Sequence, residues 1–299
     1  MTYVDNSKPT KVGYSCKLRS AIPVTSTDSK ILSGWQKEAN SGLFIHSGDI
    51  FQSENFEELT LGGGEQGTGI YIIVVMLEIT GGQGNFTVSP RVNNKATIKA
   101  RYTSFSEKTF TLSTFGVIRV KQQSSTFDVI VKSDTDTEYS VEPSSTSSMI
   151  RVEATENTPG FSGYVSSQKL HLKKNIWKVI SNWEISRVDW HFKQGDGFTA
   201  NSYTVSSEGT YYFSTNVILS FELMRNTQVE LVMMHNHVSN PTQTLYSREN
   251  LDKGQTTMHL SSTLYLKKWD YIQIAIRTDS NNTVNIVDGS TIGIAKVGE

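Results

Sequence analysis

An internal repeat constrains the fold of this chain more than any other feature of its sequence. Five short blocks recur in the same order, pairing residues 30–35 with 178–183, 48–51 with 195–198, 69–73 with 209–213, 127–130 with 269–272 and 148–152 with 291–295. The offset is about 140 to 148 residues, which is far longer than a solenoid repeat or a propeller blade. The sequence therefore predicts a duplicated domain.

Strand patterns run through most of the chain. Residues 211–223 alternate large apolar and mostly polar side chains, which places Phe213, Val217 and Leu219 on one face. A period of two is typical of a half-buried strand, and similar alternation occurs in residues 128–132, 229–235 and 271–277. Clusters of Ser, Thr, Asn and Gly separate these runs, as turns do. We expect an all-β protein with many short antiparallel strands.

The repeat also predicts the limits of the two domains. We expect an N-terminal arm over residues 1–14, a first domain over 15–153, a linker over 154–161 and a second domain over 162–299. Each domain has room for about ten short strands, which a two-sheet jelly roll accommodates while protecting most strand edges. The chain therefore reads as two tandem jelly-roll β-sandwich domains.

Charge and hydropathy exclude several partners. The chain carries 28 Lys and Arg against 29 Asp and Glu, and it has no visible basic patch, so we expect no nucleic-acid partner. Its longest apolar run, residues 70–77, is far shorter than the roughly 20 residues that cross a bilayer. We expect no membrane insertion, and this chain begins without the basic and apolar segments of a signal peptide.

The repeated blocks carry the same motifs in the same order. That order is a tryptophan ending an early strand, a Gly-x-Phe turn, a Gly-x-Tyr-x-Phe strand, an aromatic-Asp-x-Ile block and a final strand with small residues. The second half carries it on Trp183, Gly195, Phe198, Gly209, Tyr211, Phe213, Asp270, Ile272 and Gly293. The first half carries it on Trp35, Gly48, Phe51, Gly69, Tyr71, Ile73, Asp128 and Ile130. This order resembles that of the tumour necrosis factor and complement C1q globular-head superfamily.

This resemblance implies a non-enzymatic, extracellular protein that assembles as a homotrimer. Three chains would bring six domains together, and loops at the grooves would bind a cell-surface receptor or a glycan. Residues expected in the core or at a subunit interface are Trp35, Tyr71, Trp183, Tyr211 and Phe213. For partner binding we single out Tyr246, Arg248 and Asn240, because loops carry function and a Tyr–Arg pair suits an interface.

Two alternatives to this function stay open. A structural or adhesive matrix-type protein could use the same assembly. A metal-dependent, cupin-like jelly-roll enzyme could use His235 and His237, since residues i and i+2 of a strand point the same way. Cupins add a glutamate shortly afterwards, which residues 238–242 lack. Asp279 is among the loop aspartates that could offer oxygen ligands to calcium. Calcium apart, we expect no cofactor and no catalytic residue.

Overall fold

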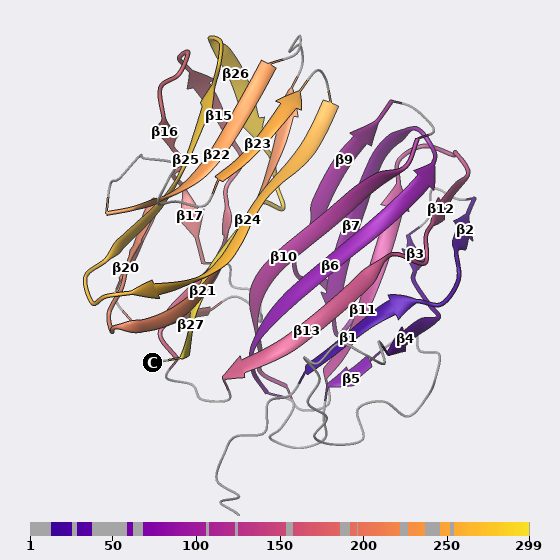
Figure 1. Cartoon of the computed structure of the whole chain (residues 1–299), viewed down its shortest axis with the longest axis horizontal. Coiled ribbons are helices and arrows are strands. Elements are labelled where there is room, and N and C mark those ends of the chain that lie inside the picture. Colours follow the sequence, from indigo (N-terminus) through magenta and orange to yellow (C-terminus); the bar gives the residue numbers. More distant parts are fainter. Residues whose placement is uncertain are drawn as a thin grey trace, which may run out of the picture.

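Figure 1 presents a computed structural model of the chain. The structure describes residues 13–25, 29–37, 59–61, 68–105, 108–122, 125–153, 158–185, 192–195, 197–221, 227–236, 246–251 and 254–298. These residues form strands, turns and connecting segments, and several antiparallel sheets. The expected all-β class is confirmed. None of the described residues belongs to a helix that is long and apolar enough to cross a membrane.

Residues 13–153, which we call the N-terminal half, contribute two sheets. Sheet A has the order β2 (Ile22–Val24), β12 (Tyr139–Val141), β6 (Gly69–Gly81), β13 (Thr146–Glu153), β1 (Gly13–Leu18) and β4 (Trp35–Lys37), with β10 (Phe110–Val120) on the other side of β6. Sheet B has the order β3 (Lys30–Ile31), β11 (Ser125–Ser133), β7 (Gly84–Val92) and β8 (Lys95–Ala96), with β5 (Leu59–Leu61) on β11 and β9 (Ala100–Ser104) on β7.

Residues 158–298, the C-terminal half, contribute the other two sheets. Sheet C has the order β15 (Gln168–Leu172), β26 (Asn282–Ile286), β21 (Gly209–Phe221), β27 (Thr291–Gly298), β14 (Gly160–Val165) and β17 (Trp183–Glu184), with β18 (Phe192–Gln194) on β14 and β24 (Gly254–Leu266) on β21. Sheet D has the order β19 (Phe198–Thr199), β20 (Ser202–Thr204), β25 (Tyr271–Thr278), β22 (Thr227–His235) and β23 (Tyr246–Leu251), with β16 (Lys178–Val179) on β25.

Each pair of sheets encloses its own hydrophobic core. Alternate side chains of β6 point inward and meet those of β7 and β11, and β21 meets β22 and β25 in the same way. Burying one face of each strand is what the period-two pattern of the sequence requires. Two of the residues singled out above lie buried in the N-terminal core and three in the C-terminal core, namely Trp35, Tyr71, Trp183, Tyr211 and Phe213.

The two halves share an asparagine turn with the same hydrogen bonds. Asn93 follows β7 and Asn236 follows β22, and both have a positive φ of 50°, which asparagine tolerates better than most residues. The Oδ1 atom of Asn93 accepts the Thr126 N–H at 2.8 Å, and that of Asn236 accepts the Tyr271 N–H at 2.8 Å. In each half this side chain therefore fixes the start of the neighbouring strand, β11 or β25.

A serine before the last strand of each half repeats in the same way. The Oγ atom of Ser145 accepts the Glu78 N–H of β6 at 3.0 Å. The Oγ atom of Ser290 accepts the Ile218 N–H of β21 at 2.9 Å. Because β6 and β21 have the same length, Glu78 and Ile218 are equivalent positions. The backbone frame is thus duplicated together with the sequence.

In one repeated block, the sequence repeat matches residues that are not at equivalent positions in the structure. Phe127 lies opposite Val92 in the β7–β11 ladder, while Ile272 lies opposite His235 in the equivalent β22–β25 ladder. The structural partner of Phe127 is therefore Ile272. Trp269, which the sequence repeat matches to Phe127, lies in the preceding turn with a φ of 77° and is 71% exposed. The structural equivalent of Asp128 is Gln273, three residues after Asp270, to which the sequence repeat matches it.

Two of the expected segment limits also differ. Strand β1 begins at Gly13, inside the expected arm, and pairs with β13. Strand β14 begins at Gly160, inside the expected linker, because Gly160 lies against Ile294 and Ala295 of β27. A Cβ atom on Gly160 would lie 2.2 Å from the Ile294 carbonyl oxygen, so only glycine allows this close approach.

Candidate functional site

Two of the three residues suggested as metal ligands, His235 and Asp279, have other partners. His235 ends β22, and its Nε2 atom lies 2.9 Å from Oδ2 of Asp270. The other carboxylate oxygen of Asp270 accepts a hydrogen bond from Asn236 at 2.9 Å. His237 falls outside the described residues. Among the residues that the structure describes, no three His, Cys, Asp or Glu side chains gather as a metal site requires.

Asp279 belongs to a duplicated strand cap. Its Oδ1 atom accepts the Gln228 N–H at 3.1 Å at the start of β22. The equivalent Asp134 accepts the Asn85 N–H at 2.7 Å at the start of β7. Each carboxylate thus satisfies a backbone donor of its own half, which gives both residues a structural role.

Two of the residues predicted to bind a partner lie on an edge strand. Tyr246 and Arg248 are on β23, opposite Val232 and Glu230 of β22. Asn240 falls outside the described residues. The structure therefore places Tyr246 and Arg248 two residues apart on one strand.

The most extensive contact with no counterpart in the sequence predictions is the junction between the halves. We use this name for the contact of β9 and β10 with β21, β24 and β27. Strand β10 is an edge of sheet A and β9 is an edge of sheet B, so together they form one open edge of the N-terminal half. This edge packs on the outer face of sheet C (Figure 1). The junction therefore joins unlike surfaces, an edge to a face.

Asn216 is the central polar group of the junction. It lies on the outer face of β21, yet it is fully buried. Its Oδ1 atom accepts the Phe115 N–H at 3.1 Å, and its Nδ2 atom donates to the Phe115 carbonyl oxygen. Nδ2 also lies 3.1 Å from Oγ1 of Thr291. One side chain thus satisfies both backbone groups of Phe115 at the edge of β10, as a neighbouring strand would.

Strands β9 and β24 meet through hydroxyl groups. The Oγ1 atom of Thr257 accepts the Arg101 N–H at 2.7 Å and donates to the Arg101 carbonyl at 2.9 Å. The Gln255 N–H donates to Oγ1 of Thr103 at 2.7 Å. Gly254 has a φ of 98°, and a Cβ atom there would lie 2.6 Å from that same hydroxyl. These contacts cover the edge of sheet B.

A histidine is buried at the junction. The ring of His259 lies against that of Phe115, with 4.7 Å between centroids, and its Nδ1 atom lies 3.5 Å from the Ser113 hydroxyl. Burial lowers the pKa of the His259 imidazole, because the charged form loses its hydration. The junction therefore favours the neutral ring.

Close apolar packing completes the junction. A cluster of Ile70, Val117, Phe192 and Ala295, with Tyr212 packed against it, spans both halves. A Cβ atom on Gly293 would lie only 2.9 Å from Cβ of Val117. The strand β27 can approach β10 because it carries no side chain at this point.

The surfaces equivalent to the two sides of the junction are not covered by the other half. On β6 the equivalents of Tyr212, Ser214 and Asn216 are Ile72, Val74 and Met76, and on β13 the equivalents of Gly293 and Ala295 are Ser148 and Ile150. Met76 is 42% exposed, and the other four are half-buried. On β24, Gln255, Thr257 and His259 contribute to the junction. The equivalents of Phe115, Val117 and Arg119 lie further along this strand and are Ser261, Thr263 and Tyr265. The chain thus offers one free face and, along the second part of β24, one free edge.

The sequence holds only a weak signal for the junction. Asn216 falls at an outward position of an alternating strand, where a polar residue is ordinary. Its equivalent Met76 is the unusual residue, since a long apolar side chain faces outward there. Comparing the two repeats at that position would have marked the face.

No protein-family model matches this sequence, and no curated protein matches it either. The function of the chain is therefore inferred from its own residues and contacts.

Proposed function

We propose that this chain is a non-enzymatic, self-assembling recognition protein built from two tandem jelly-roll domains of the TNF/C1q-like kind. The observation that carries the proposal is the junction, where an edge of one half covers a face of the other. A contact between unlike surfaces leaves one copy of each surface free at the ends of the chain. Further chains can then join by repeating the contact.

The free surfaces hold the positions equivalent to the two sides of the junction. The free face carries Ile72, Val74 and Met76, and the free edge carries Ser261, Thr263 and Tyr265. In an added copy, Ser261 would lie over Met76 as Phe115 lies over Asn216. A half-exposed apolar sheet face of this kind is typical of a protein interface. Three chains would close a ring of six domains and form a homotrimer.

Such an assembly would present its loops in several copies, outside the cell. We propose that a cell-surface receptor or a glycan binds there, with Tyr246, Arg248 and Asn240 as the partner-binding residues. Repeated weak contacts raise the total affinity by multivalency. An adhesive matrix-type protein would use the same assembly, so saturable binding to cells separates the two: recognition predicts it, and adhesion predicts further growth without it.

The test is the mass in solution, measured by light scattering with size exclusion. A single chain weighs 33.3 kDa, and we expect about three times this value for the assembly. Met76→Asp should return the mass to that of one chain, because it places a charge on the free face. Ile176→Asp is a matched control, since Ile176 is also an exposed apolar residue but lies away from the face.

A single-chain mass for the unaltered protein at all concentrations would refute the assembly. Loss of the assembly in Ile176→Asp as well as in Met76→Asp would refute the role of the free face. The same measurement with a chelator tests for a metal in the assembly: a lower mass would place a metal ion at the contact between chains.

A further inference from the structure

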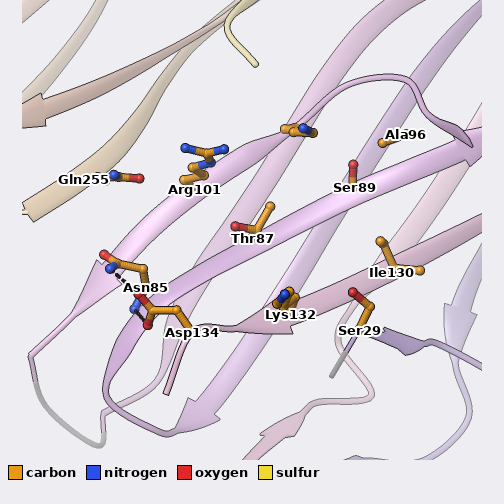
Figure 2. A pocket seen from close by; sticks show the side chains of 11 residues that line it. Ser29, Asn85, Thr87, Ser89, Ala96, Arg101, Ile130, Lys132, Asp134 and Gln255 are labelled. Carbon is orange, nitrogen blue, oxygen red and sulfur yellow. Dashed lines mark hydrogen bonds between the residues drawn. The ribbon is translucent and has the colours of Figure 1, made fainter. Parts of the chain in front are cut away.

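A charged cavity lies on the outer face of sheet B, beside the junction. It has a volume of about 420 Å³, within the range of small-molecule sites. Figure 2 shows its side chains, which come from β7, β8, β9, β11 and adjoining segments of the N-terminal half and from β24 of the other half. Its charged lining residues are Lys99, Arg101, Lys132 and Asp134. Three positive charges thus stand against one negative charge.

The single carboxylate does not neutralise these cations. Asp134 accepts the N–H of Asn85 at 2.7 Å and its side-chain Nδ2 at 2.5 Å, and Figure 2 shows the two side chains turned toward each other. Among the described residues, no ion pair is formed by Lys99, Arg101 or Lys132. The cavity therefore keeps an excess of positive charge.

Arg91, on the same sheet, is neutralised by a carboxylate of that sheet. Nη2 of Arg91 lies 2.5 Å from Oδ2 of Asp128, and its Nε donates to the other oxygen at 2.6 Å. The two residues are direct neighbours across the β7–β11 ladder. Cross-strand pairing of opposite charges is thus used in this sheet, but not in the cavity.

In the C-terminal half, the position equivalent to Thr87 of the cavity carries a carboxylate. Thr87 lies between Lys132 and Arg101 on its two neighbouring strands. In the C-terminal half, Glu230 lies between Arg277 and Arg248 in the same register.

The Glu230 carboxylate accepts a hydrogen bond from Nε of Arg277, and its side chain is only 6% exposed. The equivalent position in the N-terminal half carries Thr87, a shorter and neutral side chain. In Figure 2, Thr87 lies between Arg101 and Lys132. The N-terminal half therefore has two flanking cations without the carboxylate that the C-terminal half places between them.

The remaining lining provides hydrogen bonds rather than a dry pocket. Hydroxyl groups come from Ser29, Thr87 and Ser89, and an amide comes from Gln255 of β24. Polyhydroxylated ligands are recognised by this kind of convergent polar group, while the cations hold an anionic oxygen group.

We propose that this cavity binds an acidic sugar, whose anionic oxygen group occupies the place that the Glu230 carboxylate has in the C-terminal half. Arg101 and Lys132 flank that group, and the hydroxyl-lined part of the cavity receives the sugar ring. The site is complete in one chain and does not depend on self-association. Because Gln255 lines it, the bound sugar contacts both halves and holds them together at the junction.

The test is isothermal titration calorimetry of the full chain at low salt. The probes are glucuronic acid, glucose 6-sulfate, glucose 6-phosphate, glucose and inorganic phosphate. We expect the acidic sugars to bind, with an affinity that falls as salt is raised, and glucose to show no heat of binding. The three acidic sugars distinguish a carboxylate from a sulfate or phosphate ester. Inorganic phosphate should bind at least about tenfold more weakly than the best acidic sugar, because it lacks the ring.

Two variants at one position separate charge from size. Thr87→Glu supplies the carboxylate from within and should weaken sugar binding at least about tenfold, the effect expected for loss of a charge-assisted hydrogen bond. Thr87→Gln has nearly the same size without the charge and should bind more tightly than Thr87→Glu. Lys132→Gln removes an exposed cation and should weaken binding about tenfold, while Lys169→Gln, a matched exposed lysine of β15, should not.

Several results would overturn the proposal. These are equal binding by Thr87→Glu and the unaltered chain, binding of glucose as tight as that of the acidic sugars, or no heat with any acidic sugar. Inorganic phosphate binding as tightly as the sugars would refute the sugar part. If Thr87→Glu failed to fold, the comparison of Lys132→Gln with Lys169→Gln would decide, since both residues are exposed.

Discussion

The two halves of the chain share a backbone frame but differ in what their outer surfaces carry. The turns of Asn93 and Asn236 make the same hydrogen bonds. On the outer face of sheet C, however, Asn216 is fully buried, whereas its equivalent Met76 on sheet A is 42% exposed. The inner positions of a duplicated fold are restricted by packing, so divergence concentrates on the outer positions. On sheet C, such a difference marks the surface that the other half covers.

The substitution with the largest expected effect on stability removes the central amide of the junction. Asn216→Leu leaves the Phe115 N–H and C=O without their partner, and each unsatisfied buried group costs about 1–3 kcal/mol. We expect the free energy of unfolding to fall by about 3 kcal/mol in urea titrations. The equivalent change, Met76→Leu, should alter it by less than about 0.5 kcal/mol at dilute protein. Equal effects at both positions would contradict the difference between the two faces.

A second test adds atoms where the strands approach most closely. Gly293→Val places a side chain against Val117, since even a Cβ atom would lie 2.9 Å from Cβ of that residue. We expect a loss of about 2 kcal/mol, the usual cost of overpacking. Ser148→Val, at the equivalent half-buried position of β13, should cost little. Thermal unfolding at dilute protein measures both, and tolerance of Gly293→Val would mean that the halves separate easily.

A third test makes the C-terminal half resemble the N-terminal half. Glu230→Thr leaves Arg277 without its carboxylate, although that side chain keeps its contact with the Trp177 ring at 4.4 Å. We expect a loss of about 1–2 kcal/mol, less than for a fully buried pair because Arg277 is partly exposed. Glu230→Gln retains a hydrogen-bond acceptor and should cost less. An unchanged urea midpoint in Glu230→Thr would show that the ion pair adds nothing to stability.

The smallest effect concerns pH at the junction. The folded chain lowers the pKa of His259, so the unfolded chain binds this proton more readily. Stability from the neutral ring is therefore complete above the unfolded pKa of about 6.5 and is lost as pH falls below it. We expect a loss of stability between pH 7.5 and 5.5 that is smaller than the effects of the three substitutions above. His259→Phe retains the ring contact and should remove this part of the pH dependence, which urea titrations at pH 7.5 and 5.5 would measure.

Strand content, duplication and core positions could be predicted from the sequence because they depend on local patterns. Alternation placed Tyr71 and Tyr211 inward, and both are buried. The match of Phe127 to Trp269 was wrong because an Asp follows each of them, and only the strand ladder shows the three-residue shift. A repeat alignment depends on residue identity, whereas the fold depends on register.

Surfaces between distant segments could not be predicted in the same way. The place of Thr87 between Arg101 and Lys132 requires the register of three strands at once. Asn216 is polar in an outward position, and nothing in its neighbours along the chain distinguishes burial by another half from exposure to water. Tyr246 and Arg248 were chosen from loop composition, and the structure places them on β23.

Joining an edge-bearing half to a face-bearing half within one chain restricts the symmetry of any assembly. Every chain brings both halves, so a ring closed through this junction contains an even number of them: four from two chains, or six from three. A ring of three halves would need one and a half chains, so one half of the second chain would lie outside the ring. Fusion of the two halves thus excludes odd-numbered rings, whatever angle a single free half would prefer.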